Sequence, residues 1–269
     1  MARVMAGGCQ EMKEKVVVFS GAGLSTESGI PTFRSSGGLW REHKVEDLAS
    51  QEGWAKDRDF VLHFYQQRMH NVSACEPNAA HKAFADLEEK YHVHHVTQNV
   101  DNLLERAGCT NVRHLHGDLF HRKCERHFSC SLLERDLNYQ CDYLIEHTEP
   151  VKAGDLCEKC KRQMRPNVVW FGEAVDMSGL DELPKATDIF IVVGTSAQVH
   201  PAASLLGTFE NCRELYFIDP DPAPAPRLKS YSRYEDTATN AVPRVVRDLL
   251  TLPTHERLQR HQQRITTSD

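Results

Sequence analysis

Two cysteines have the spacing of metal ligands. Cys157 and Cys160 are separated by two residues, as in the knuckles of structural zinc sites. A tetrahedral zinc site takes four ligands, so two more are needed. Five of the nine cysteines fall between positions 124 and 160, in a polar segment with no clear strand or helix pattern. We therefore expect residues 122–165 to form a small inserted module that binds one structural zinc ion.

The remaining ligands of this zinc site are less evident. Cys124 supplies a third thiolate, and either His127 or Cys130 completes the set; we favour Cys130. Redox use of the Cys157–Cys160 pair is the competing function, but the segment lacks the strand-to-helix setting of thioredoxin-like motifs. An odd number of cysteines in a chain of this length also argues against a disulfide framework.

The composition is that of a soluble protein with one large or two small domains. The chain has 269 residues, a formal charge of −6, 40% hydrophobic and 26% charged residues. The mild acidity argues against a dedicated nucleic-acid binder. No apolar run approaches the roughly 18 residues of a membrane helix. We see neither a signal peptide nor an Arg-rich leader, so we expect a cytoplasmic protein without membrane partners.

Strand and helix patterns alternate along most of the chain. Short apolar, β-branched runs predict buried strands at residues 16–19, 93–96, 189–193 and 215–218, with helices predicted at 58–69, 81–90, 102–107 and 202–209. This alternation predicts an α/β fold, a Rossmann-like doubly wound parallel sheet. We assign residues 12–121 and 166–252 to this sheet domain, about 31–80 to a helical insertion, and 253–269 to a polar tail.

A glycine-rich turn follows the first predicted strand. Gly21 and Gly23 permit a tight turn and a close approach of the backbone to a phosphate, at a helix N-terminus that favours negative charge. A third glycine is missing, because position 26 is Thr. The two glycines alone therefore describe a plain strand-to-helix turn equally well.

The longer sequence around this turn resembles the signature of the sirtuins, which are NAD-dependent protein lysine deacylases. Residues 21–34 read GAGLSTESGIPTFR, and 35–40 continue with SSGGLW. Further blocks follow in the family's order: TQNVDNL at 97–103, HLHG at 114–117, PNVVWFGE at 166–173 and GTS at 194–196. The resemblance extends from about residue 16 to residue 250.

The resemblance implies an NAD site and a general base. Amides and carboxylates that follow a strand suit nicotinamide and ribose hydroxyls, although Asn99 and Asp101 also suit helix capping. The family usually has Asn where this chain has Asp219. The matched NAD-binding positions are Gly21, Ala22, Gly23, Ser25, Thr26, Phe33, Arg34, Trp40, Gln98, Asn99, Asp101, Gly194, Thr195, Ser196 and Asp219.

Two histidines compete for the role of general base. Imidazole titrates near neutral pH, so His114 and His116 both qualify by type, and the family's His-Gly step selects His116. The implied reaction starts when the acyl oxygen of a modified lysine attacks the nicotinamide ribose. His116 then helps a ribose hydroxyl to attack, which gives free lysine, nicotinamide and O-acyl-ADP-ribose.

The resemblance also indicates which acyl group is removed. Tyr65 and Arg68 are three residues apart on a predicted helix and can reach one small group. Their pattern is similar to that of class III sirtuins, in which this pair binds the carboxylate of succinyl- or malonyl-lysine. We therefore expect desuccinylation to exceed deacetylation. Val169, Phe171 and Gly172 match the family's substrate-binding segment, so acylated lysines of proteins are the expected partners.

Two other functions fit parts of the sequence. One is transfer of a single ADP-ribose to protein from the same NAD site. The other is a non-catalytic, zinc-containing protein that senses NAD. The presence of Gln98, Asn99, Asp101 and His116 together argues against the second, because a site without turnover does not need all four.

Overall fold

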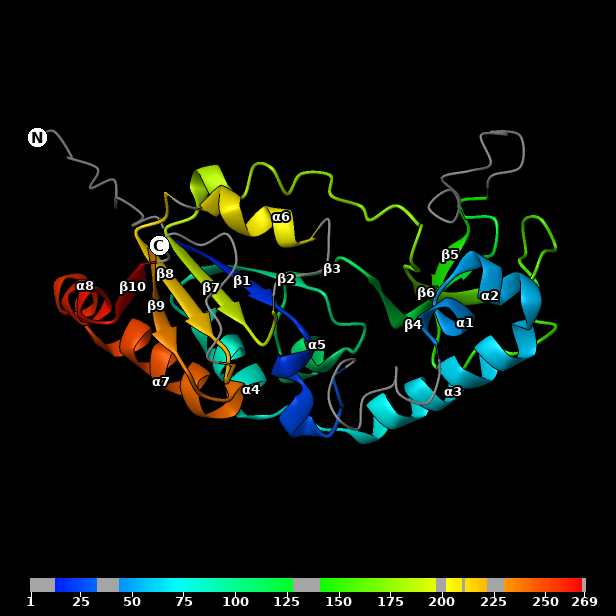
Figure 1. The fold of residues 1–269 in the computed structure, drawn as a ribbon, viewed down its shortest axis with the longest axis horizontal. Coiled ribbons are helices and arrows are strands. Elements are labelled where there is room, and N and C mark those ends of the chain that lie inside the picture. Colours follow the sequence, from blue (N-terminus) through cyan, green and yellow to red (C-terminus); the bar gives the residue numbers. More distant parts are fainter. Residues whose placement is uncertain are drawn as a thin grey trace, which may run out of the picture.

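A seven-stranded sheet in the order β10-β9-β8-β7-β1-β2-β3 forms the larger unit of the molecule (Figure 1). The computed structural model describes residues 13–32, 44–127, 141–196, 202–209, 211–221 and 230–267. The parallel strands are β1 (Lys15–Ser20), β2 (His92–Thr97), β3 (Val112–His114), β7 (Ile189–Val193), β8 (Glu214–Ile218) and β9 (Ser230–Tyr234). Strand β10 (Ile265–Thr267) pairs antiparallel with β9. The predicted parallel α/β sheet is confirmed.

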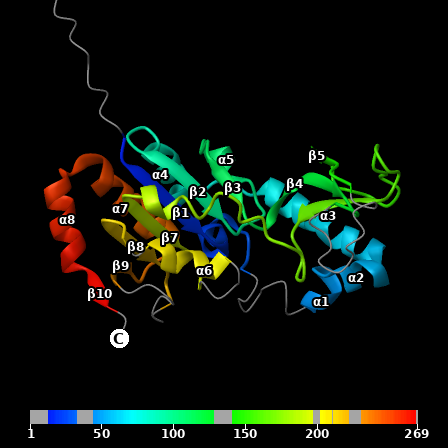
Figure 2. The same cartoon turned by 90° about the horizontal axis from the view of Figure 1, so that it is seen from above.

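Helices cover both faces of this sheet, as Figures 1 and 2 show. Helices α4 (Ala79–Leu87) and α7 (Ala238–Thr251) lie on one face, and α6 (Ala202–Leu206) lies on the other. Val16 and Val18 of β1 pack in the same apolar cluster as Phe84, whereas Val17 packs in the cluster of Phe209. Because both faces are buried, the strands are apolar at consecutive positions.

The smaller unit joins an antiparallel sheet to the helices of the predicted insertion. Its strands, in the order β5-β4-β6, are β4 (Gly117–Cys124), β5 (Leu144–Glu146) and β6 (Met164–Val168). Helices α1 (Val45–Leu48), α2 (Gln51–Lys56) and α3 (Arg58–Ala74) lie beside it (Figure 1). Trp54, Phe64 and Trp170 belong to their shared apolar cluster. Helix α3 begins where the carboxylate of Asp57 accepts from the Phe60 N–H.

Most of the segment predicted as a polar tail, residues 253–269, has regular secondary structure. It forms helix α8 (Thr254–Gln263) and strand β10. Its polar residues Arg257 and His261 are buried, where they hydrogen-bond Glu214 and Ser232. A polar sequence looked like a tail because its partners lie on distant strands. Among the described residues, no helix is long and apolar enough to cross a membrane.

The buried ion pair that attaches α8 yields a stability prediction. Arg257 Nε lies 2.9 Å from Glu214 Oε1, with side chains 2% and 0% exposed. Arg257→Met leaves a buried carboxylate poorly compensated, so we expect the free energy of unfolding to fall by about 3–5 kcal/mol. The control is Arg260→Met, whose pair with Asp248 is exposed; it should cost less than about 1 kcal/mol. Urea denaturation measures both, and equal losses would contradict the prediction.

Candidate functional site

Most of the predicted NAD-binding residues lie at one edge of the large sheet. They follow the carboxyl ends of β1, β2, β7 and β8. From β1 the chain builds outward through β2 and β3, and later returns to build outward on the other side through β7 and β8. The edge between β1 and β7 is therefore the switch point at which open α/β sheets bind ligands. The predicted residues Phe33, Arg34 and Trp40 lie outside the described residues.

The glycine-rich turn packs directly on the end of β7. The Gly23 N–H donates to the Gly194 carbonyl at 2.9 Å, and a Cβ on Gly23 would come within 2.6 Å of the Gly194 Cα. Gly194 itself has a φ of +62°. The backbone after Gly21 forms two short 3-10 helices, η1 (Ala22–Leu24) and η2 (Thr26–Ser28). Close contact of two backbones thus fixes the turn.

A buried polar network joins the loops after β1 and β2. Ser25 Oγ donates to Asp101 at 3.0 Å and accepts from Asn99 Nδ2 at 3.2 Å. Burial raises the pKa of Asp101. His81, which the sequence analysis missed, has its Nε2 at 3.4 Å from Ser25 Oγ. Burial lowers the pKa of His81 to about 4, so this imidazole is neutral at pH 7. The only sequence signal for His81 is its helix-capping spacing from Asn78.

The strongest indication of a ligand at this edge is the side-chain amide of Gln98. Its Oε1 accepts from Thr195 Oγ1 at 2.9 Å, so two predicted NAD-binding residues bond each other. Its buried Nε2 has no hydrogen-bond partner among the described residues. A buried donor without an acceptor is costly, and a bound carboxamide or phosphate oxygen would satisfy it. This orphan donor fits NAD.

The structure separates the two candidate histidines. His116 Nδ1 lies 3.0 Å from the Gln98 carbonyl, which can only accept, so Nδ1 carries the proton and the Nε2 lone pair remains available. Burial lowers the pKa of His116, so the neutral form dominates at pH 7. His114 instead contacts acceptors through both nitrogens, the Asn99 carbonyl and Glu105, each at 2.7 Å.

His114 therefore has the opposite electrostatic character. Burial alone would lower the pKa of His114, but the hydrogen bond and charge of Glu105 raise it above the ordinary value. Both ring nitrogens of His114 face acceptors, so neither directs a lone pair toward a substrate hydroxyl. His116 is thus the one of the two that can act as a base.

The predicted substrate segment runs directly beside His116. The Val169 N–H donates to the His116 carbonyl at 2.8 Å, and Gly117 pairs with Val168. Phe171 is held to the chain near α2 by its N–H bond to the Ala49 carbonyl at 2.9 Å, while its side chain is 60% exposed. An exposed aromatic side chain on this ordered loop offers a contact for a peptide.

Tyr65 and Arg68 lie together, as their helical spacing predicts. Both are buried on α3, with exposed fractions of 6% and 7%. Burial lowers the pKa of Arg68, while the charges of Tyr65 and Asp101 oppose this shift. Asp101 belongs to the polar network at the sheet edge, so Arg68 lies within electrostatic reach of the predicted NAD site. A buried guanidinium favours an anionic neighbour.

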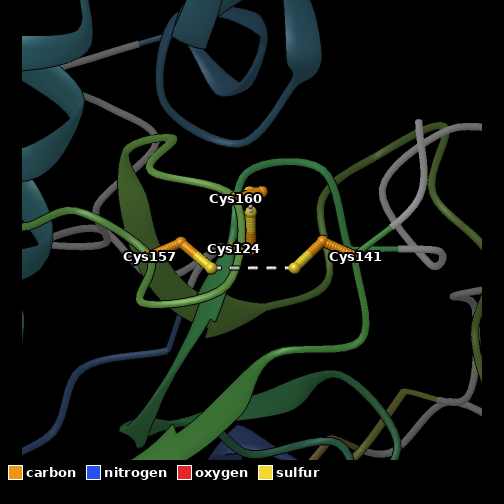
Figure 3. Close-up of side chains that lie close together, drawn as sticks. All are labelled: Cys124, Cys141, Cys157 and Cys160. Atoms are coloured by element: carbon orange, nitrogen blue, oxygen red, sulfur yellow. Dashed lines mark hydrogen bonds between the residues drawn. The ribbon is translucent and has the colours of Figure 1, made fainter.

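Four cysteine side chains converge in the small unit, as Figure 3 shows. Their sulfur atoms all lie within 4.8 Å of one another; Cys124 and Cys160 are 3.3 Å apart, and Cys141 and Cys157 are 3.6 Å apart. Sulfurs in a tetrahedral zinc–thiolate site are about 3.8 Å apart, given zinc–sulfur bonds of about 2.3 Å. Four converging thiols of this spacing fit one structural zinc ion, with no open position for catalysis.

The cluster corrects one predicted ligand. Cys124, Cys157 and Cys160 are members as expected, but the fourth is Cys141 rather than the favoured Cys130. Cys130 lies outside the described residues, and His127 is not in the cluster. Cys141 reaches the cluster because its backbone forms an isolated β-bridge with His127, three residues after the end of β4. Such a bridge between residues 14 positions apart leaves no local spacing signal.

Comparisons with known proteins agree with one another. A profile of the Sir2 family matches residues 21–201. An NAD-dependent protein deacylase of Helicobacter pylori is 39% identical over 91% of this chain and all of its own. A Sir2 homologue variant solved with ADP-ribose superposes with a TM-score of 0.75 at 38% identity, covering 90% of this chain and 95% of that one. A Sir2 homologue solved with NAD gives 0.74 at 36% identity, covering 88% and 90%.

The cysteine cluster predicts how substitutions change the metal content. Cys141→Ser removes one of four thiolates, so we expect zinc per chain to fall well below one and the melting temperature to drop. Cys130→Ser should keep one zinc per chain, and Cys212→Ser, a thiol outside the cluster, serves as the matched control. Elemental analysis by mass spectrometry, followed by thermal unfolding, measures both quantities. Zinc loss in Cys130→Ser with retention in Cys141→Ser would overturn the assignment.

Proposed function

This chain belongs to the Sir2 family, and we propose that, as an NAD-dependent protein deacylase, it acts preferentially on lysine acyl groups that end in a carboxylate. The observation that carries the acyl preference is the buried pair of Tyr65 and Arg68 on α3, within electrostatic reach of Asp101. Succinyl- and malonyl-lysine have such a carboxylate, and acetyl-lysine does not.

The chain's own groups account for cofactor binding and orientation. Gln98 offers its orphan Nε2–H directly beside the glycine-rich turn, because its own backbone N–H donates to the Ser20 carbonyl at the end of β1. Asp101, fixed by Ser25, accepts hydrogen bonds from hydroxyl or amide donors. When bound, NAD supplies an activated ribose carbon that the acyl oxygen of the lysine attacks as nicotinamide leaves.

His116 supplies the base in this proposal. The Gln98 carbonyl holds its Nδ1 proton, so Nε2 is directed to accept a proton from a ribose hydroxyl. One water is consumed, and the proposed products are the free lysine, nicotinamide and O-acyl-ADP-ribose. Val169, which bonds the His116 carbonyl, and the following Phe171 and Gly172 are the proposed contacts of the substrate backbone.

A carboxylate on the acyl group suits the charge of its proposed pocket. Arg68 provides a planar fork that matches a carboxylate, and the Tyr65 hydroxyl provides one more donor. Arg165 and Glu173 also lie within electrostatic reach of Tyr65. Two positive groups and one negative group thus surround this hydroxyl, which favours an anionic ligand over a neutral one.

The protonation of His116 predicts how the rate of deacylation depends on pH. Because burial lowers the pKa of His116, its Nε2 lone pair is present at pH 7 and is lost as the pH falls through that pKa. We expect kcat/KM for deacylation to have an acid limb with a midpoint below about 6.5, the ordinary histidine value. His116→Ala should lower the rate by about 100- to 10,000-fold. His63→Gln, on the exposed side of α3, is the control. An acid limb that survives His116→Ala would exclude this base.

The second prediction concerns the acyl group. With one peptide carrying either succinyl- or acetyl-lysine, we expect higher kcat/KM for the succinyl form. Arg68→Met should lower that value about 10- to 100-fold while affecting the acetyl peptide less, because a hydrogen bond to a charged group contributes about 1.5–3 kcal/mol.

Arg58→Met, an exposed cation on the same helix, is the matched control and should leave the ratio unchanged. Equal losses for both peptides with Arg68→Met would refute the carboxylate preference. Mass spectrometry of the same reactions identifies O-acyl-ADP-ribose as the expected product, whereas ADP-ribosylated protein would indicate transfer to protein instead.

A further inference from the structure

The hydroxyl of Tyr65 has a fixed hydrogen-bond donor. Trp170 Nε1–H donates to Tyr65 Oη at 3.0 Å, and the two rings are nearly parallel, with centroids 6.4 Å apart. Within the part of the chain that the structure describes, this is the one hydrogen bond of the Tyr65 hydroxyl. Burial raises the pKa of Tyr65 to about 12, so the hydroxyl keeps its proton at neutral pH.

This contact determines what the Tyr65 hydroxyl can do for a ligand. An indole N–H is only a donor, so the Tyr65 oxygen must act as the acceptor toward Trp170. The single hydroxyl hydrogen is then directed elsewhere, toward another acceptor. A carboxylate is an acceptor only, so it matches the remaining hydrogen. A ligand group that donates a hydrogen bond would be disfavoured here, because the Tyr65 oxygen already accepts one from Trp170.

Trp170 is itself held in place by a buried carboxylate. Its backbone N–H donates to Glu173 Oε2 at 3.0 Å, and Gln51 Nε2 donates to Glu173 Oε1 at 2.5 Å. Arg165, at the second position of β6, also bonds Glu173 Oε1 and stacks its guanidinium on the Trp170 ring, 3.6 Å from the centroid. These contacts fix both the backbone and the ring of Trp170.

The network also connects the proposed acyl pocket to the zinc unit. Lys123 Nζ lies 3.5 Å from Glu173 Oε2, and its side chain is 1% exposed. Lys123 immediately precedes Cys124, and Arg165 lies on β6, which pairs with β4. Strand β4, which carries the zinc ligand Cys124, therefore also carries Lys123, and its partner β6 carries Arg165. These two cations hold Glu173.

We propose that Trp170 is a positioning residue for acyl specificity: by donating to Tyr65 Oη, it directs the Tyr65 hydroxyl hydrogen toward the carboxylate of the acyl group. Glu173 and Arg165 keep the indole in the orientation that this requires. The inference rests on the proposed preference for succinyl- or malonyl-lysine and assigns part of that preference to a residue that need not touch the substrate.

Trp170→Phe tests this role, because it removes the N–H donor and keeps an aromatic ring beneath Arg165. We expect KM for the succinyl peptide to rise so that the succinyl-to-acetyl ratio of kcat/KM falls about threefold to tenfold, the range of one neutral hydrogen bond. Values of kcat, and the kinetics with the acetyl peptide, should change by less than about twofold.

A double-mutant cycle separates this route from a general packing effect. If Trp170 acts through the Tyr65 hydroxyl, Trp170→Phe should not lower the ratio further when Tyr65→Phe is already present. The matched control is Trp54→Phe: Trp54 packs 5.5 Å from Trp170 and donates its own indole N–H to Glu125, but its N–H does not bond Tyr65. It should leave the ratio unchanged.

The outcomes distinguish failure of the proposed carboxylate preference from failure of the positioning role of Trp170. If the unmodified enzyme has no succinyl preference, or Arg68→Met lowers both peptides equally, the proposed function fails. If that preference holds but Trp170→Phe leaves the ratio unchanged, or lowers both peptides equally, only the positioning role fails. If Trp170→Phe does not fold, replacement of Trp170 by its benzothiophene isostere removes the N–H while keeping the ring shape, and the same criteria apply.

Discussion

The site depends on the contact between the start of β4 and the end of β6, at the point where the chain passes from the large sheet into the small one. Gly117 begins β4 directly after His116, with a φ of +70°, and pairs with Val168 of β6. A Cβ at this position would come within 1.7 Å of the Asn167 carbonyl oxygen, so only glycine permits the approach. The close approach places the His116 imidazole between the edge of the large sheet and the segment that continues from β6.

Electrostatic roles in this site are decided by single partners. His114 and His116 are two residues apart and both largely buried, yet the pKa shifts of their imidazoles are opposite. The difference arises because Glu105 reaches Nε2 of His114, whereas the one hydrogen bond of the His116 imidazole within the described segments is to a backbone carbonyl. The His114 imidazole is held by a carboxylate, and the His116 imidazole keeps a lone pair. Sequence distance has no bearing on this outcome, because Glu105 lies on helix α5 (Leu103–Ala107) and Gln98 lies in the loop after β2.

The small unit does more than hold a metal. Its strands carry Lys123 and Arg165, whose charges meet the buried Glu173 beside Trp170. Buried charges of this kind are tolerated only when they are paired and hydrogen-bonded, so their geometry is tightly restrained. Tyr65 of α3 therefore packs against Trp170, a side chain that this network holds in a fixed orientation.

The sequence by itself determined the local and patterned features of this protein. Apolar runs identified β1, β7 and β8, because strands buried on both faces are apolar throughout, and the valines at both ends of residues 93–96 identified β2. The motifs after these strands predicted the ligand edge. Helical spacing identified the pairing of Tyr65 with Arg68. Only the tertiary structure decided the fourth thiol, Cys141, and the burial of α8. Both features depend on contacts between residues far apart in the chain, and neither the periodicity nor the spacing of the sequence indicates which residues make such contacts.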